Sequence, residues 1–540
     1  MNTRQIWATV VAVVAVVAVV CVTGFYYGWF APLQLEGAAG PVASWTPRGD
    51  GTDGYYSQKL VWGSCDGVTL NEGEGENTDD PTVYQCARVS APLDWDAPSG
   101  ESIELAVAVR RSGTANAPFL FVNPGGPGGA VVESLPYYAG SLLGKKVVRA
   151  YDIVALDPRG VGQSTPVRCL SDSERDEKNA GGDGSSDTAD LAPDEIVAAA
   201  EQESADFAAG CERLTGELYK HVDTVSAAKD FDLVRALVGA PALNLLGYSY
   251  GTFLGATYAG LFPDKVGRFV LDGAVDPAVD VNEMSAMQMR GLDAAIQHWI
   301  DDCQAGPRCP LGKSHADGVS TLVSFIKALE SQPMRTRDPQ RPLTSNLALS
   351  AIYGAMYDTS WYQTLTSAVG QAISNADGSA LLEIADLLNE RNDDGTYSGN
   401  SLDALVVVNN LDYGPVGTVD EWAEAASALE AELPIMGPYG GPGGVAARPR
   451  RTRPDRSRGG GAHRGRRDHA RPRHPVPDGA VPGVPALQRG PGLRRGVGPH
   501  VVQAGREPVR CGRGREVPGG RDGPPVGPHV PVRAPVTGTM

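Results

Sequence analysis

The stretch GYSYG at residues 247–251 constrains the fold of this chain more than any other feature. It follows the apolar run 242–246, which has the composition of a buried strand, and it precedes a helical pattern at 252–261. Glycines on both sides of a serine allow a sharp strand-to-helix turn, which lifts the hydroxyl to the edge of a sheet above the helix N-terminus. The pentapeptide alone also fits a plain turn, but its flanking elements make Ser249 the candidate nucleophile.

A second glycine-rich segment, FVNPGGPGG at residues 121–129, follows an earlier apolar run. Because it carries few side chains, its backbone N–H groups are able to face inward toward a developing negative charge. A loop of this kind and the N–H of the residue after the nucleophile, here Tyr250, form the oxyanion hole in such sites. The alternatives are a simple turn and a phosphate-binding loop, and the second is disfavoured because no G-K-[ST] follows.

Short apolar runs alternate with helical patterns over residues 55–276, which indicates a mostly parallel sheet with helices on both faces, the α/β class. The predicted strands are 102–109, 118–122, 151–156, 242–246 and 268–271, and the predicted helices are 194–218, 226–237 and 252–261.

Residues 277–435 carry helical patterns with few strand signals, which predicts a helical lid inserted at the sheet's carboxyl edge. Its predicted helices are 284–303, 316–330, 347–358, 362–375 and 421–433. The lid side chains Trp299, Met356, Trp361 and Tyr362 are candidates for a pocket wall, although packing inside the lid is the more common role for such residues.

The first 30 residues predict an export signal or a membrane anchor. Arg4 is the only charge before an uncharged run rich in Val and Ala at residues 6–30. About 20 apolar residues span a bilayer, so this length favours a membrane anchor, with a cleaved signal peptide as the alternative. Arg4 holds the N-terminus inside, which predicts an extracytoplasmic chain that is membrane-anchored or secreted. Residues 31–54, rich in Gly, Ala and Pro, predict a linker.

Export changes the interpretation of the eight cysteines, six of which lie between the N-terminal segment and residue 440. An even number in an oxidising compartment predicts disulfides, and no Cys/His spacing indicates a metal. Spacing alone leaves the connectivity open but favours the pairs Cys65–Cys86, Cys169–Cys211 and Cys303–Cys309.

The composition changes abruptly near residue 440. Residues 441–540 hold 20 of the 47 basic residues, 6 of the 64 acidic residues, and no Phe, Tyr, Trp or Ile. Such a segment has little apolar surface to offset the entropy of ordering, so a disordered Arg/Pro/Gly-rich tail is predicted in place of the last part of the core. A nucleic-acid-binding arm is an alternative, but export and the absence of Lys and aromatic residues there argue against a nucleic-acid partner.

Three segments taken together resemble a known family: NPGGPGG at 123–129, DPRGVGQS at 157–164, and the run from GYSYG to VDP at 247–277. They are similar to the exported tripeptidyl and prolyl aminopeptidase-like α/β-hydrolases, and the similarity extends in order over residues 61–433.

The resemblance implies an α/β-hydrolase fold, with Ser249 as nucleophile and Gly125, Gly126 and Tyr250 as oxyanion donors. It implies structural roles near the site for Asp157 and Arg159, through ion pairing. The implied activity is the release of short peptides from a free N-terminus, without a cofactor. Acidic lid residues such as Glu283 and Asp293 are candidates for holding the substrate's ammonium group, and the sequence does not single one out.

The rest of the catalytic triad is missing from the readable pattern. In this fold the order along the chain is Ser, then Asp or Glu, then His. The resemblance places the acid in a motif like G-T-x-D-P-x-T-P and the His in a G-H turn, both after the lid, and neither follows Tyr439. Without the His no group accepts the hydroxyl proton, and without the acid none orients the His.

We hypothesise that the tail is a translation of the right DNA in the wrong frame. Read one base later with free third positions, residues 468–480 permit Thr-Thr-Arg-Asp-Pro-Ala-Thr-Pro-Tyr-x-Met, which matches the missing acid motif. The same shift turns residues 496–501 into Gly-Trp-Gly-His-Thr, a His turn, and residues 515–520 into a string compatible with Lys-Cys-Leu-Glu-Asp. The three motifs appear in one frame and in the family's order.

If the tail is kept as written, its five His residues are most simply solvated, and none of the earlier three, His221, His298 and His315, follows a sheet strand after the lid. The sequence therefore predicts an exported serine hydrolase that acts on peptide N-termini and is impaired as written. The alternatives are a carboxylesterase of the same fold and an inactive membrane-anchored binding protein.

Overall fold

The computed structural model describes residues 51–71, 78, 80–181, 193–414 and 416–439. The predicted anchor or signal at residues 1–30, most of the linker and the tail at 441–540 lie outside these ranges. Within them, no helix combines the length and apolar character that a membrane span requires.

Six strands form one sheet in the order β1-β2-β4-β3-β5-β6. Neighbours among β3 to β6 pair in parallel, whereas β1 and β2 form an antiparallel hairpin whose second strand pairs antiparallel with β4. The predicted mostly parallel sheet is confirmed. Strand β1 was not predicted, because the polar residues Gln85, Arg88 and Ser90 interrupt its apolar sequence pattern. The bounds are β1 Tyr84–Pro92, β2 Ser102–Arg110, β3 Phe119–Asn123, β4 Asp152–Leu156, β5 Leu243–Tyr248 and β6 Val266–Asp272.

Each helix predicted from the sequence overlaps an observed one. The structure adds α2 to α5, α13 and α14; the β-branched run Val406–Val408 in α14 has the composition of a strand. The helices are α2 Asp53–Tyr56, α3 Leu135–Tyr137, α4 Lys145–Ala150, α5 Asp172–Ala180, α6 Pro193–Thr215, α7 Thr224–Leu237, α8 Tyr250–Leu261, α9 Val281–Ala305, α10 His315–Ser331, α11 Ser345–Ala355, α12 Tyr362–Asn375, α13 Ser379–Leu388, α14 Ser401–Asp412 and α15 Val419–Glu432. Shorter helical turns are η1 Tyr138–Leu142, η3 Gly216–Lys220, η4 Pro263–Lys265, η5 Thr359–Trp361 and η6 Gly437–Tyr439.

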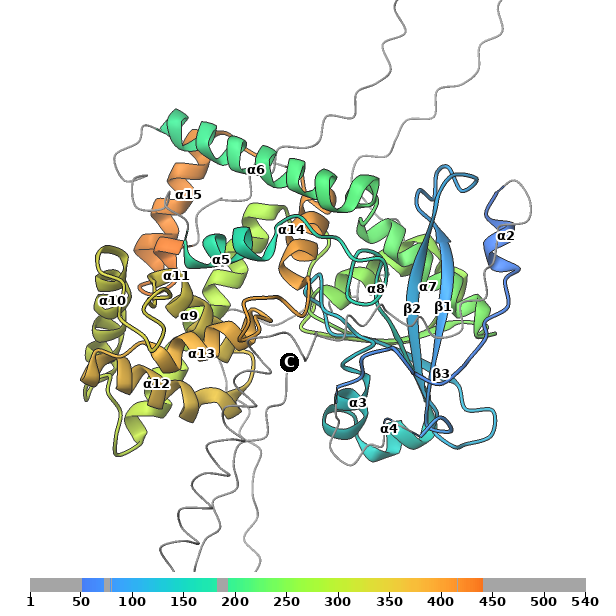
Figure 1. The fold of residues 1–540 in the computed structure, drawn as a ribbon, viewed down its shortest axis with the longest axis horizontal. Coiled ribbons are helices and arrows are strands. Elements are labelled where there is room, and N and C mark those ends of the chain that lie inside the picture. The colour runs from blue at the N-terminus through green and yellow to red at the C-terminus, as the bar shows by residue number, and fades with distance from the viewer. Residues whose placement is uncertain (1–50, 72–77, 79, 182–192, 415, 440–540) are drawn as a thin grey trace, which may run out of the picture. The chain divides into compact units, whose positions relative to one another are not determined.

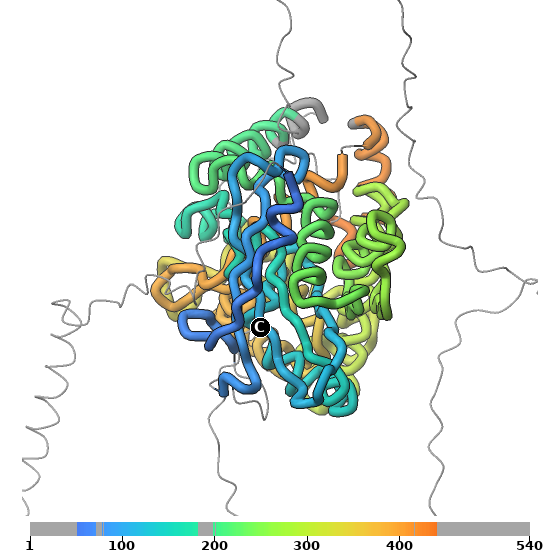
Figure 2. Tube along the Cα trace, turned by 90° about the vertical axis from the view of Figure 1, so that its right-hand side faces the viewer, coloured from blue at the N-terminus to red at the C-terminus, as the bar shows by residue number. Residues whose placement is uncertain are grey.

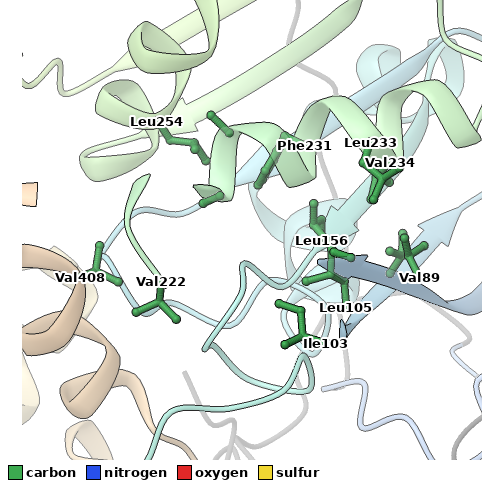
Figure 3. Packing of buried hydrophobic residues seen from close by; sticks show 14 of the residues in the cluster. Val89, Ile103, Leu105, Leu156, Val222, Phe231, Leu233, Val234, Leu254 and Val408 are labelled. Atoms are coloured by element: carbon green, nitrogen blue, oxygen red, sulfur yellow. The ribbon is translucent and has the colours of Figure 1, made fainter. Parts of the chain in front are cut away.

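Side chains of the central strands alternate between two apolar clusters, as the period of two along a strand dictates. Phe121 and Leu156 belong to the cluster that includes residues of α7 and α8, whereas Val122 and Ile153 belong to the cluster that includes residues of α3 and α4. Figure 3 shows side chains of α7 above Leu156 in the first cluster, with Val408 of α14 at its margin. Helices therefore cover both faces of the central sheet.

The helices that follow β6 build a second apolar core of their own. Trp299 of α9 and Phe325 of α10 lie in it together with Ile352 of α11 and Leu365 of α12. Figure 1 shows α9 to α13 gathered beside the strand-bearing part of the chain, and Figure 2 gives the same trace turned by 90°. The favoured disulfide pairing is confirmed at all three positions, Cys65–Cys86, Cys169–Cys211 and Cys303–Cys309.

The edge strand β6 is exposed on both faces. Every residue of the central strand β4 is buried, whereas β6 has no buried residue. Its apolar side chains Val270 and Leu271 are 58% and 38% exposed, and the outer edge of β6 pairs with no other described strand. A parallel strand is normally covered on both faces, so β6 has the sequence of an interior strand in an edge position.

Candidate active site

Ser249 lies at a strained turn between β5 and α8. Its backbone has φ 50° and ψ −120°, a conformation that is uncommon for a residue other than glycine and disfavoured by about 1–3 kcal/mol. A Cβ on Gly247 would collide with the Gly251 carbonyl oxygen, and a Cβ on Gly251 would lie 2.8 Å from the Asn123 carbonyl oxygen. The two flanking glycines are therefore required by the turn, as the pentapeptide predicts.

The end of β6 fixes the turn from the other side. The Ser249 N–H donates to the Asp272 carbonyl oxygen at 2.9 Å, and the Thr252 hydroxyl donates to the Ser249 carbonyl oxygen at 2.6 Å. The same Thr252 oxygen accepts from the Val275 N–H at 2.9 Å. Residue 249 is thus bound to the segment that leads from the sheet into the lid.

The glycine loop after β3 lies against the turn. A Cβ on Gly125, whose φ is +100°, would lie 2.6 Å from the Tyr248 carbonyl oxygen and 3.0 Å from the Ser249 Cβ. The Gly125 N–H donates to Asn123 Oδ1 at 3.0 Å, which occupies one of the three predicted oxyanion donors. The N–H groups of Gly126 and of Tyr250, the first residue of α8, have no acceptor among the residues that the structure describes. Gly125 instead allows the loop to approach Ser249 closely.

Asp157 holds the chain that continues from this loop. Its carboxylate accepts from the N–H groups of Val131 and Val132 at 2.6 and 2.8 Å and from the Gln163 N–H at 2.8 Å. Burial raises the pKa of Asp157, and the three backbone donors oppose that rise. The sequence expectation of ion pairing is corrected for this residue, because backbone amides satisfy its carboxylate.

Arg159 does form an ion pair, with a partner that the sequence does not indicate. Its guanidinium contacts both carboxylate oxygens of Asp230 on α7, at 2.7 and 2.8 Å, and both side chains are fully buried. Arg159 also donates to the carbonyl oxygens of Pro92, Leu93 and His221. The residue therefore ties β1, the turn after β4 and the start of α7 together behind the site.

Ser249 lines a cavity of about 780 Å³ whose walls include residues of α9, α11 and α14. Gly126 and Tyr250 line it beside Ser249, and one face of α9 supplies Met284, Met287, Gln288, Gly291, Leu292 and Ala295. Tyr353 and Tyr357, at the two ends of the segment that carries Met356, add an aromatic wall. Of the predicted wall residues, Met356 lines the cavity, whereas Trp299 and Tyr362 are buried in the lid core and Trp361 packs against it.

No His side chain among the described residues lines the cavity. His298 and His315 border a separate hollow of about 460 Å³ on α9 and α10, and His221 lies 3.9 Å from Asp94. The described ranges also contain no group of three or more His, Cys, Asp or Glu side chains placed to hold a metal. Among the described residues, the side chains beside Ser249 in this cavity therefore include no imidazole.

A partly buried carboxylate at the end of α14 holds the Tyr250 side chain through Thr224. Asp412 accepts from the Thr224 N–H at 2.8 Å and from the Thr224 hydroxyl at 2.5 Å, and that hydroxyl also contacts the Tyr250 hydroxyl. The first turn of α14 packs closely against the glycine loop. A Cβ on Gly128 would collide with the Ser401 carbonyl oxygen, so only glycine fits there. One helix therefore contacts both the glycine loop and the residues that hold the Tyr250 side chain, an arrangement that long-range contacts reveal and the sequence does not.

The chain matches the family model described as the alpha/beta hydrolase fold over residues 118–394, about half of its length. The chain belongs to the alpha/beta hydrolase family. It is 36% identical over 362 residues to the serine protease Hip1 of Mycobacterium tuberculosis, covering 65% of this chain and 67% of that protein. Carboxylesterase B of the same organism is 34% identical over 405 residues, covering 74% of this chain and 75% of the relative.

The tripeptidyl aminopeptidase of Streptomyces lividans is 37% identical over 295 residues. The match covers 53% of this hydrolase and 52% of the relative, so it spans about half the length of that protein. The resemblance to tripeptidyl aminopeptidase-like hydrolases is confirmed, and the hydrolase is of the serine class. Both peptidase and esterase names occur among these relatives.

Asp412 of this hydrolase is expected to make folding stability depend on pH. Burial raises the pKa of Asp412 to about 6, against an ordinary value of 3.8, while the hydrogen bonds from Thr224 oppose the rise and nearby Asp223 adds to it. The folded chain therefore binds this proton more tightly than the unfolded chain, and ionisation destabilises the fold as the pH rises from about 4 to above 6.

Replacing Asp412 with Asn removes this titration. The free energy of unfolding of the parent, relative to Asp412→Asn, is expected to fall by roughly 2–3 kcal/mol between pH 4 and pH 7. Urea unfolding of both proteins at several pH values measures the difference between their free energies of unfolding. The readout is how this difference changes with pH, because the amide of Asn alters the hydrogen bonds at every pH. Parallel curves would contradict the assignment.

Proposed function

We propose that this hydrolase releases short peptides from the free N-terminus of peptide substrates, with Ser249 as the nucleophile. The observation that carries the proposal is that Ser249 lines the same cavity as Gly126 and Tyr250, whose N–H groups have no acceptor among the described residues. Hydrogen-bond donors already in place where negative charge develops are a large contribution to acyl-transfer catalysis. The tripeptidyl aminopeptidase relative supports a peptide substrate.

The cavity has the size that the proposal needs. A sphere of 780 Å³ is about 11 Å across, and three extended residues span about 10 Å. The volume also lies within the range of about 300–1,000 Å³ that is usual for ligand pockets. An N-terminal tripeptide therefore fits between Ser249 and the lid, with the scissile carbonyl at the serine.

In the proposed reaction, Ser249 Oγ attacks the carbonyl carbon of the scissile bond. The carbonyl oxygen takes the electron pair and is stabilised by the N–H groups of Gly126 and Tyr250. A base accepts the hydroxyl proton and returns it to the leaving amine, which leaves the acyl group on Ser249 for hydrolysis by water. Asp157 and Arg159 act structurally: Asp157 fixes the chain that continues from the glycine loop, and Arg159 ties β1 to α7 through Asp230.

We further propose that the acid and the base come from the alternative reading frame of the tail. The exposed β6 supports this, because Val270 and Leu271 are apolar residues on an edge that a following strand would cover. The uncovered edge strand is independent of the acid motif and the His turn, since it comes from the fold whereas both motifs come from the shifted reading of the tail.

A carboxylesterase is the second candidate, favoured by the apolar wall of the cavity and by the carboxylesterase relative. A panel of three substrates separates the two: a tripeptide amide, its N-acetyl form and a short acyl ester, each assayed with the frame-restored protein and with the chain as written. The peptidase proposal expects the free tripeptide amide to be hydrolysed with the highest kcat/KM. Faster hydrolysis of the ester together with indifference to N-acetylation would instead establish the esterase.

A further inference from the structure

The cavity that contains Ser249 has little charge on its walls. Of the described residues that line it, Lys178 at the end of α5 and Glu203 on α6 alone carry a charge. Most of the other lining residues are apolar or aromatic, with a few uncharged polar side chains such as Gln288 and Asn409. Any cationic group of a ligand in this space therefore has one carboxylate available to it.

Lys178 and Glu203 are paired with each other, and the pair is open to solvent. Lys178 Nζ lies 2.5 Å from Glu203 Oε1, with side-chain exposures of 45% and 69%. An exposed ion pair contributes little to stability, because water screens it and both side chains lose freedom. A second cation that enters the cavity can therefore replace Lys178 as the partner of Glu203 at little cost.

Helix α6 presents Glu203 to the cavity as part of a continuous face. Ser204 and Phe207, one and four residues further along the helix, line the same cavity. Phe207 thus provides an apolar surface close to the carboxylate. This arrangement suits a group that is charged at one end and apolar beside it, as an N-terminal residue is.

The lid carboxylates expected from the sequence do not serve this purpose. Asp293 is buried, and one of its oxygens accepts from the N–H groups of Ile435 and Met436 at 2.9 and 2.8 Å. Glu283 does not line the cavity. The choice among the 64 acidic residues therefore falls on a residue outside the predicted lid.

We propose that Glu203 binds the free N-terminal ammonium group of the peptide substrate, with Lys178 as its partner in the empty cavity. This inference rests on the proposed function, since an esterase has no ammonium group to recognise. Glu203 is then the specificity-determining residue that distinguishes a free N-terminus from a blocked one. The displaced Lys178 side chain returns to water.

The test measures binding rather than turnover, so it does not depend on the triad. Full-length protein with Ser249→Ala is titrated by calorimetry with the amide of Ala-Ala-Phe and with its N-acetyl form. The free amine is expected to bind about tenfold more tightly. Adding Glu203→Gln should bring the two dissociation constants within about twofold of each other while leaving that of the acetyl peptide unchanged.

Two matched variants of the same protein sharpen the result. Lys178→Met removes the competitor and is expected to tighten binding of the free amine only. Glu201→Gln removes an exposed carboxylate on α6 that does not line the cavity, and it is expected to change neither constant.

A preference for the free amine that persists in Glu203→Gln would overturn the role of Glu203 and leave the peptidase function standing. Equal binding of both peptides by the parent would overturn both proposals, as would binding of neither. If Glu203→Gln weakened the binding of both peptides equally, Glu203 would have a structural role, and this result would also overturn the assignment.

Discussion

Restoring the alternative reading frame after residue 440 is expected to raise hydrolysis of a tripeptide amide by at least about 10⁴-fold. The magnitude follows from the loss of rate in a serine hydrolase that lacks its base or its acid, which is about 10⁴- to 10⁶-fold. The expectation rests on the frame hypothesis: the described residues place no His in the cavity of Ser249, and the restored segment would supply one to accept the hydroxyl proton. Rates of the two full-length proteins under saturating substrate measure the effect.

Ser249→Ala in the restored protein is the control, and it should return the rate to that of the chain as written. Hydrogen exchange supplies a readout that is independent of chemistry: the amides of β6 should exchange more slowly in the restored protein, because a new neighbour covers the edge of Val266–Asp272. Equal rates and equal exchange in both proteins would refute the frame hypothesis. So would a gene that reads through this region in one intact frame.

Arg159→Ala is expected to lower the free energy of unfolding by about 3–5 kcal/mol. The substitution leaves the Asp230 carboxylate buried with Trp95 Nε1 at 3.0 Å and without its cation, and an uncompensated buried charge is strongly destabilising. It also leaves the carbonyl oxygens of Pro92, Leu93 and His221 without the guanidinium donor. Equilibrium unfolding in urea, followed by tryptophan fluorescence, measures the change.

An exposed ion pair of the same type serves as the comparison. Arg337 and Glu383 in the lid are 75% and 60% exposed, so Arg337→Ala should change the unfolding free energy by less than about 1 kcal/mol. A double variant, Arg159→Met with Asp230→Leu, should recover part of the loss, because it removes both charges together. Equal effects of Arg159→Ala and Arg337→Ala would show that burial of the pair does not matter.

The turn at Ser249 was predictable because it depends on neighbouring residues. A strand, a glycine-flanked serine and a helix follow one another without a gap, so local sterics alone require the turn at residues 247–251. The glycine loop and the amphipathic lid helices carry equally local signals. By contrast, the predicted ion pair of Asp157 was wrong. The Asp-x-Arg-Gly turn does not show that the backbone N–H groups of Val131 and Val132 donate to the Asp157 carboxylate.

The sequence by itself determined the fold class, the favoured disulfide pairs, the turn at Ser249 and the glycine loop beside it, since each depends on residues close in the chain or on a repeating period. Only the tertiary structure decided that Asp230, 71 residues away, pairs with Arg159, and that α14 contacts both the glycine loop and the Thr224–Tyr250 pair. It also decided that Glu203 is the one acidic side chain among the described residues that line the cavity. These contacts join segments whose separation along the chain carries no pattern, because their proximity arises only when the sheet and the lid have packed.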